Sequence, residues 1–409
     1  MPMDPFDELL EQCHYPGPEP WVMPAYGGRS TINLMSSLLA HYGVEFGAPL
    51  AFHEEFAAAL RGRRKIQLLL LDGLGWLNLE AARGRPMVDA LVRASRRWPI
   101  TTVFPSTTTA ALSSYLSALP PSRHGVIGFS MYFPEYQRPF NMLSLHSLGE
   151  DRTDLLSLGF VPEDYIGHPT VLKRLRDAGV LAGGFVKDIF AFNGLSRLTY
   201  HDYQPYAFLA PGDLIGMTMD QLSTPLPVFQ FVYWSHLDTI AHTYGPRSEA
   251  YLDELQMLAT IILHQLQPRM DDDTVLVICA DHGHLEGAGD PVINLTDMPD
   301  LVQLFRAAPA GEGLAQHIFL QPGTEARARQ ALLAVEGLTI LTREEFLHLE
   351  LLGSPPYHPG LLDRIGDLIL LPHGPRRFLF QYQRRPHTFM NGRHGGMTPE
   401  QMVVPLMVL

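Results

Sequence analysis

The chain has 409 residues, of which 46% are hydrophobic and 18% are charged, which excludes a disordered protein and a small disulfide-held domain. Its 30 Lys and Arg against 43 Asp and Glu give a net charge of −13, which disfavours a nucleic acid polymer as partner. An anionic ligand therefore requires a local source of positive charge, and the 18 histidines make bound metal a candidate.

The two cysteines, Cys13 and Cys279, are far apart, and Cys279 lies in an apolar run typical of a buried strand. This pattern does not indicate a disulfide framework and fits a reducing compartment. The acidic N-terminus lacks the apolar segment of a signal peptide, and no apolar stretch is long enough for a transmembrane helix. We therefore expect a cytoplasmic protein without a membrane partner.

The N-terminal region is rich in proline, which stands at positions 2, 5, 16, 18, 20 and 24. We expect an extended arm over residues 1–28 rather than a helix. A helical pattern follows from Arg29 and stops at Gly43. Apolar runs that end in polar residues then occur in the order KIQLLLLDG, ITTVFPSTTT, PVFQFVYWSHLD and TVLVICADHGH.

Helical patterns separate these apolar runs, including AALSSYLSAL at 110–119 and YLDELQMLATIILHQL at 251–266. Strands that alternate with helices predict an α/β protein with a doubly wound sheet and helices on both faces. Such sheets bind ligands at the carboxyl ends of their strands, which is where the polar residues of this chain gather.

Residues 295–385 show a different pattern, with the short strands HIFLQ and GLTIL around a helix over ARARQALLAV. We expect a small α/β cap insertion over 295–385, including strands that return to the core. The catalytic α/β core is then expected at 29–294 and 386–409. The sequence does not indicate an oligomeric state.

Residues that can ligate a metal gather at the predicted strand ends. They are Asp72, the hydroxyl run Ser106–Thr109, Asp238, His242, Asp281, His282 and His394. Three carboxylates and three imidazoles suit two divalent ions, most readily Zn²⁺, with Mn²⁺ as an alternative. Each residue alone also fits a turn, a helix cap or a surface pair, but their joint placement favours a metal site.

The segments that carry these residues resemble the alkaline phosphatase superfamily, above all its type I phosphodiesterase/nucleotide pyrophosphatase branch. The resemblance rests on LLLLDGLG, VFPSTTTAALSSYLSALPPSRHGVIG, YWSHLDTIAHTYGP, ADHGH and HGGMTPEQMVVPL, which run in order from about residue 66 to the C-terminus. It implies an alkaline-phosphatase-like fold and a two-metal hydrolase of phosphoric esters.

The resemblance also implies a division of labour among the site residues. Around one zinc it places Asp72, Thr108, Asp281 and His282, and around the other Asp238, His242 and His394. Thr108 is the implied nucleophile because the family pattern places it three residues after Pro105, with Thr107 as the alternative. A helix beginning near Ala110 would offer N–H groups to the phosphoryl group, and a phosphothreonine intermediate would be hydrolysed by water.

One departure from the family pattern concerns the substrate. Nucleotide pyrophosphatases typically carry an Asn in this element that holds a phosphoryl oxygen, whereas Thr108 is followed here by Thr109, Ala110 and Ala111. A backbone N–H or the Thr109 hydroxyl is the alternative donor. The missing amide leaves the metal centre intact but weakens the assignment of nucleotides as substrates.

Other polar residues near these motifs receive structural interpretations. We expect His284 to face solvent rather than to support the metal site, and His124 to fix a turn. Arg29 and Arg393 are expected at the surface, although either is able to contact an anion.

We therefore expect a metal-dependent hydrolase of a small-molecule phosphoric ester, either a phosphodiesterase or a pyrophosphatase, with a nucleotide as one candidate substrate. The alternatives within the superfamily are a phosphomonoesterase and a phosphosugar mutase. A sulfatase is disfavoured because neither cysteine stands in a C-x-P-x-R context. The alternative from another class is a non-catalytic metal-binding homologue, although every implied ligand is present.

Overall fold

The computed structural model describes residues 3–44, 46, 54–149, 151–287, 289, 291–382 and 389–409. A seven-stranded sheet forms the larger lobe of this part of the chain, in the order β2-β18-β9-β1-β8-β6-β7. Its strands are β1 (Lys65–Leu71), β2 (Arg96–Thr101), β6 (Leu181–Lys187), β7 (Tyr206–Phe208), β8 (Val228–Trp234), β9 (Thr274–Cys279) and β18 (Val403–Val408). The strands from β9 to β7 are parallel, whereas β18 runs antiparallel to both of its neighbours.

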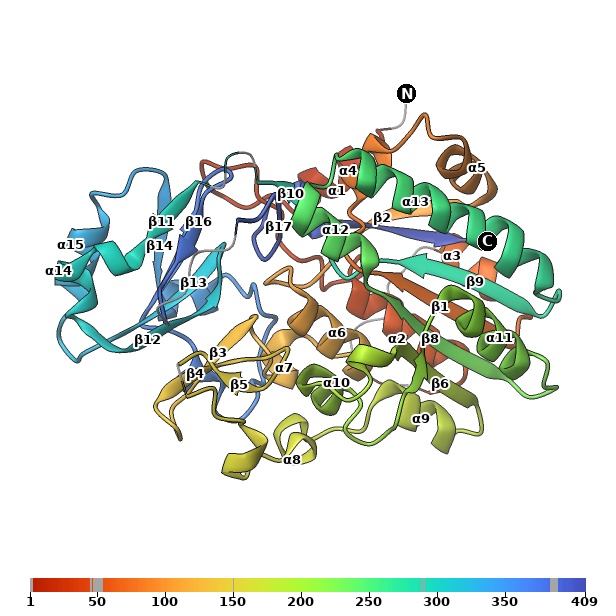
Figure 1. Cartoon of the computed structure of the whole chain (residues 1–409), viewed down its shortest axis with the longest axis horizontal. Coiled ribbons are helices and arrows are strands. Elements are labelled where there is room, and N and C mark those ends of the chain that lie inside the picture. Colours follow the sequence, from red (N-terminus) through yellow and green to blue (C-terminus); the bar gives the residue numbers. More distant parts are fainter. Residues whose placement is uncertain are drawn as a thin grey trace.

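Helices cover both faces of this sheet (Figure 1). On one face lie α5 (Pro86–Ala94), α12 (His236–Tyr244) and α13 (Glu249–Ile261), and on the other α2 (Thr31–His41), α6 (Thr108–Ser117) and α9 (Val171–Asp177). The expected doubly wound α/β fold is thus confirmed, with the antiparallel β18 as an addition. Within the described ranges, no helix combines the length and the apolarity that a membrane crossing requires.

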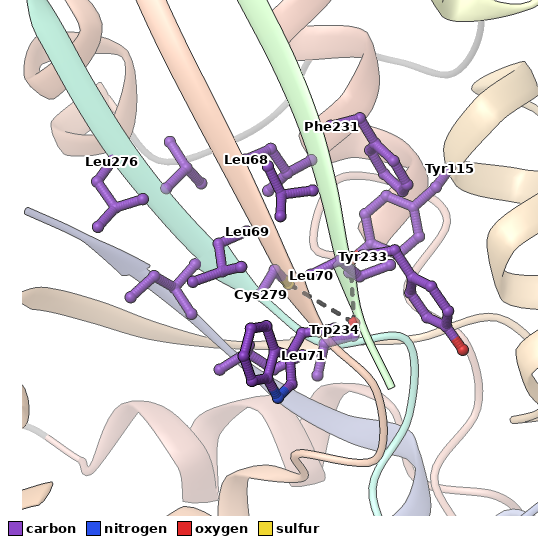
Figure 2. Packing of buried hydrophobic residues seen from close by; sticks show 14 of the residues in the cluster. Leu68, Leu69, Leu70, Leu71, Tyr115, Phe231, Tyr233, Trp234, Leu276 and Cys279 are labelled. Atoms are coloured by element: carbon purple, nitrogen blue, oxygen red, sulfur yellow. Dashed lines mark hydrogen bonds between the residues drawn. The ribbon is translucent and has the colours of Figure 1, made fainter. Parts of the chain in front are cut away.

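The apolar runs form the centre of the sheet because they are buried on both faces. Figure 2 shows Leu68–Leu71 of β1 between Leu276 of β9 and Phe231 of β8. The ring of Tyr115 on α6 lies 5.9 Å from that of Phe231, and its hydroxyl donates to the carbonyl of Ala280 at 2.9 Å. This packing fixes α6 against the carboxyl end of β9.

A second sheet forms the smaller lobe, in the order β14-β15-β13-β12-β3-β4-β5. Its strands are β3 (Ser130–Phe133), β4 (Arg138–Asn141), β5 (His146–Ser147), β12 (Phe305–Glu312), β13 (Ala315–Leu320), β14 (Leu338–Thr342) and β15 (Leu368–Pro372). The sequence places this lobe within 295–385, but β3–β5 come from the segment that follows α6 and α7. They join β12 through the register pair Gly311–Ser130, a long-range contact without a local sequence signal. The expected boundary between residues 385 and 386 lies outside the described residues.

The remaining elements connect or cover the two sheets. The helices are α1 (Pro5–Gln12), α3 (Glu54–Leu60), α4 (Trp76–Ala81), α7 (Pro121–His124), α8 (Pro162–Ile166), α10 (Gly194–Thr199), α11 (Pro211–Leu222), α14 (Pro299–Val302), α15 (Glu325–Leu332), α16 (Arg343–His348), α17 (Leu361–Arg364) and α18 (Pro399–Met402). Two-stranded pairs form between β10 (Leu285–Glu286) and β17 (Gly392–Arg393), and between β11 (Val292–Asn294) and β16 (Arg377–Leu379).

The N-terminal segment corrects one expectation, because α1 is a helix within the region predicted to be an extended arm. Pro5 occupies the first helical turn, where its missing N–H costs nothing. The Asp4 carboxylate accepts a hydrogen bond from the Phe6 N–H at 2.8 Å and caps the helix. The Phe6 ring stacks on Trp76 at 6.1 Å and Leu9 is buried, so α1 packs on the larger lobe.

Candidate active site

The implied ligands lie together at the carboxyl end of the large sheet. Asp72 directly follows β1, Asp281 and His282 follow β9, and α12, which follows β8, carries Asp238 and His242. Since β9, β1 and β8 are adjacent and parallel, their carboxyl ends meet at one edge of the sheet. His394 enters from the segment after β17 and completes the set.

One cluster contains Asp72, Asp281 and His282, and all three are buried. The His282 Nε2 atom lies 3.5 Å from Asp72 Oδ1 and 3.4 Å from Asp281 Oδ2. The other carboxylate oxygens have protein donors, since Tyr233 donates its hydroxyl proton to Asp72 Oδ2 and Gly73 donates its N–H to Asp281 Oδ1 at 3.1 Å. The cluster therefore has fixed carboxylates that converge on one imidazole nitrogen.

A second cluster contains Asp238, His242 and His394. The two imidazole Nε2 atoms are 3.1 Å apart and lie 3.3 Å and 3.6 Å from Asp238 Oδ1. Their Nδ1 atoms face backbone carbonyls, at 2.8 Å from Gly392 O for His242 and 3.1 Å from Ser106 O for His394. An Nδ1–H donated to each carbonyl leaves both Nε2 lone pairs directed at the same point, as metal ligation requires.

The donor chemistry of these clusters fits bound cations. Asp72 Oδ1 and Asp281 Oδ2 are buried oxygens without a hydrogen-bond donor among the described residues. Burial raises the pKa of Asp72 well above its usual value, and repulsion from Asp281 and Asp238 raises it further. Burial likewise raises the pKa of Asp281. A cation between the two oxygens would satisfy both and relieve this repulsion.

The pKa values in the second cluster shift in a different way. Burial alone would raise the pKa of Asp238, but the charges and hydrogen bonds of His242 and His284 outweigh it and hold that pKa well below its usual value. Burial and the neighbouring imidazoles hold the pKa of His394 well below its ordinary value. An ionised carboxylate and a neutral imidazole are the forms that bind a divalent ion, and Asp238 and His394 are held in these forms. Burial would lower the pKa of His242, but the charge and hydrogen bond of Asp238 outweigh it and raise that pKa, so a bound ion would displace a proton from His242.

Thr108 is the first residue of α6, and its Oγ1 lies 3.2 Å from His282 Nε2. It therefore stands beside the first cluster, at a helix N-terminus whose first N–H groups have no acceptor within the helix. Thr107 is the N-cap residue of α6 and is buried.

Two residues near the site differ from their sequence expectations, and a third is excluded as an alternative hydrogen-bond donor. His284 does not face solvent: its ring is buried, and its Nε2 lies 2.9 Å from Asp238 Oδ1. Asp238, His282 and His284 also meet closely enough to hold a metal ion. Arg393 is buried rather than at the surface. The Thr109 hydroxyl donates to the carbonyl of Gly128 at 2.9 Å, so it is not available as the substitute donor, which leaves the backbone N–H groups.

The sequence interpretations of His124 and Arg29 agree with the structure. His124 is the buried last residue of α7, and its Nδ1 accepts the N–H of Val126 at 3.1 Å across the turn that follows the helix. Arg29 forms an ion pair with Glu8 at 2.9 Å and is partly exposed.

Glu312 lies at the end of β12 between two glycines, and no sequence motif marks it as a site residue. Its carboxylate accepts the N–H of Phe129 and a hydrogen bond from Thr107, next to the implied nucleophile. Burial raises the pKa of Glu312 to about 8, although these hydrogen bonds and His242 lower it in part. Glu312 thus joins the smaller lobe to the start of α6.

Two cavities open at Thr108. The larger, of about 560 Å³, lies between the lobes and reaches His242, Glu312 and His394. The smaller, of about 260 Å³, reaches Asp72 and the segment around α10. Thr108, Leu143 and Asp238 line both cavities, so the threonine stands where they adjoin.

The fold and these clusters define an α/β protein with a candidate centre for two metal ions. A profile of the type I phosphodiesterase/nucleotide pyrophosphatase family matches residues 67–397, and the chain belongs to this family. The chain is therefore an enzyme, a hydrolase of the phosphodiesterase and pyrophosphatase type. No curated protein matches its sequence.

Solved structures with the same fold include two relevant neighbours. Murine ectonucleotide pyrophosphatase/phosphodiesterase 5 is similar over 84% of this chain and 87% of its own, with 18% identity and a TM-score of 0.63. Phosphonoacetate hydrolase from Sinorhizobium meliloti 1021, in complex with phosphonoacetate, is similar over 85% of this chain and 90% of its own, with 19% identity and a TM-score of 0.60. An inactive variant of the murine protein, with a threonine replaced by alanine, is known in complex with AMP.

We expect Glu312→Gln to remove a loss of stability that the wild-type protein shows between about pH 4.5 and about pH 8. Because the pKa of Glu312 rises from 4.5 to about 8 on folding, its bound proton stabilises the fold fully below about pH 4.5. That stabilisation is lost as the pH rises through about 8. Relative to the variant, the free energy of unfolding of the wild-type protein should fall by up to about 1 kcal/mol per pH unit across this window. Urea denaturation of both chelator-treated proteins measures this difference, and pH curves of equal slope would contradict it.

Proposed function

We propose that the enzyme hydrolyses a phosphodiester or a related phosphoric ester with two divalent metal ions and Thr108 as the nucleophile. The observation that carries this proposal is the position of the Thr108 hydroxyl, 3.2 Å from His282 Nε2 and at the junction of two cavities. Zn²⁺ is the proposed metal because the ligand set combines imidazoles and carboxylates, and Mn²⁺ is the alternative.

Each cluster would hold one ion. Asp72, Asp281, His282 and Thr108 would bind the first, and Asp238, His242 and His394 the second, since these residues converge in two separate groups. When bound, the ions supply positive charge that favours the ionised hydroxyl and offsets the charge of the phosphoryl group. His284 would position Asp238 through its hydrogen bond rather than act on the substrate.

Thr108 would carry out the nucleophilic attack, and the first turn of α6 would hold the phosphoryl group. The Thr108 Oγ forms a bond to phosphorus while the ester oxygen of the leaving group departs, and water later hydrolyses the phosphothreonine ester. The N–H groups of the first turn of α6, where Thr108 is the first residue, have no acceptor within the helix and would hold a phosphoryl oxygen in place of the missing amide. The murine neighbour is inactive when a threonine is replaced by alanine, which supports a threonine in this role.

Cavities on both sides of Thr108 favour a diester over a monoester. A diester carries two substituents on phosphorus, and two adjoining cavities provide a space for each. A monoester has one substituent and would leave one cavity without a contact. The murine neighbour is known in complex with AMP, and we therefore include a nucleotide among the proposed substituents on phosphorus.

We expect Thr108→Ala to lower kcat for bis-p-nitrophenyl phosphate at least about a thousandfold, because the covalent step would lose its nucleophile. Metal content by inductively coupled plasma mass spectrometry should stay close to wild type, since the carboxylates and imidazoles remain. Thr107→Ala is the matched variant, and it should retain most of the activity. Loss of turnover in Thr107→Ala alone would transfer the nucleophile to Thr107, and full activity of both variants would refute threonine catalysis.

The zinc-loaded enzyme should hydrolyse bis-p-nitrophenyl phosphate with a higher kcat/KM than p-nitrophenyl phosphate. The second ester group gains contacts in the second cavity, and a difference of about tenfold or more is expected. Rates of p-nitrophenolate release measure it directly. Faster monoester turnover would instead place the enzyme among phosphomonoesterases, and zinc binding without any turnover would favour the non-catalytic homologue.

A further inference from the structure

We infer that the larger cavity is a binding subsite for an uncharged apolar substituent, aryl or alkyl, of the phosphoric ester. This inference rests on the proposed function, because the cavity adjoins the Thr108 hydroxyl. The two cavities differ in chemistry as well as in size. That difference assigns the larger, less polar substituent of the ester to the cavity between the lobes.

The smaller lobe and the segment before β17 contribute apolar side chains to the wall of this cavity. They include Phe129, Leu148, Leu314, Phe378, Phe380 and Met390. These residues lie in the segments that flank β3 and β5, in the β12–β13 turn, in β16 and directly after it, and before β17. Strands β3–β5, β12, β13 and β16 belong to the smaller lobe, and β17 lies between the two lobes (Figure 1). Ligand sites of this composition bind apolar groups by removing them from water.

The wall is preformed rather than collapsed. The Phe380 ring packs against Phe305 at 6.2 Å and against Tyr382 at 5.1 Å. The Tyr382 hydroxyl donates to the carbonyl of Pro309 at 2.6 Å, which leaves its ring as the part available to line the cavity. A cavity fixed in this way does not require ordering when the ligand binds.

Phe129 is the side chain with unused apolar surface. It is 37% exposed, lines the larger cavity, and has no aromatic ring against it among the described residues. Its backbone N–H is held by the Glu312 carboxylate, so the ring stays at the cavity rim beside the active site. An aryl or alkyl group of the substrate would cover this ring.

The polar groups of the wall are mostly committed to the protein itself. Arg393 is buried, and its guanidinium donates to the carbonyls of Pro375 and Gly287. The smaller cavity is richer in hydroxyl groups, including those of Ser235 and Thr239, and holds the aromatic residue Phe190. Because apolar side chains dominate the wall, an apolar group gains more contacts in the larger cavity than a second charged phosphate group does, although Arg377 also lines it.

Binding of phenylphosphonate and methylphosphonate tests this assignment without turnover. These anions share one phosphonate group and differ in the apolar substituent. Isothermal titration calorimetry of the zinc-loaded wild-type protein should give a Kd at least about tenfold lower for phenylphosphonate. Phe129→Ala should reduce that preference about fivefold or more, and Phe129→Leu should retain most of it, because leucine keeps an apolar side chain at the rim.

Two control variants locate the phenyl group. Phe192→Ala changes an exposed phenylalanine, 62% exposed, that lines neither cavity. Phe190→Ala changes an aromatic residue of the smaller cavity instead. Both should keep the wild-type preference for phenylphosphonate. A preference that depends on Phe190 rather than Phe129, or equal wild-type affinity for both phosphonates, would overturn the assignment.

Hydrolysis of bis-p-nitrophenyl phosphate by the same preparation separates this inference from the proposed function. A Phe129-dependent preference without hydrolysis would contradict the proposed function and leave the subsite in place. Hydrolysis without any preference would contradict the subsite alone. Phe129→Ala, Phe129→Leu and Phe192→Ala should show wild-type thermal unfolding, because Phe129 and Phe192 are both exposed at the surface. Phe190→Ala should unfold at a somewhat lower temperature, because Phe190 packs against the main core.

Discussion

Three carboxylates brought together in a mostly buried site impose the constraint on which this molecule depends. Asp72, Asp238 and Asp281 meet where three neighbouring strands of one sheet end. Burial and mutual repulsion raise the pKa of Asp72, so this arrangement is costly without positive charge nearby. The surrounding imidazoles provide part of that charge, and the proposed metal ions would provide the rest.

The parallel strands of the large sheet hold these carboxylates together because their registers match. Leu71 of β1 pairs with Trp234 of β8, and Leu70 pairs with Cys279 of β9, so the residues that follow each strand emerge side by side. The smaller lobe then covers this edge and contributes Glu312 and most of the apolar wall of the larger cavity. The large sheet thus positions the candidate metal ligands, and the contact between the lobes determines the space available to the substrate.

The part of the site that follows apolar strands could be predicted from the sequence. Asp72, Asp281 and His282 each follow an apolar run, and parallel strands have only one edge at which their carboxyl ends meet. Glu312 and strands β3–β5 could not be found in this way, because their pairing joins segments about 180 residues apart through one register pair. The burial of His284 is likewise a tertiary effect, since it depends on Asp238 from another element.

The central claim is that two metal ions occupy the two clusters beside Thr108. A crystal structure of the zinc-loaded enzyme, with anomalous data collected on both sides of the zinc edge, measures this directly. The account predicts one anomalous peak among Asp72, Asp281 and His282 and a second among Asp238, His242 and His394. A single ion held by Asp238, His282 and His284, or no ion at either cluster, would contradict it.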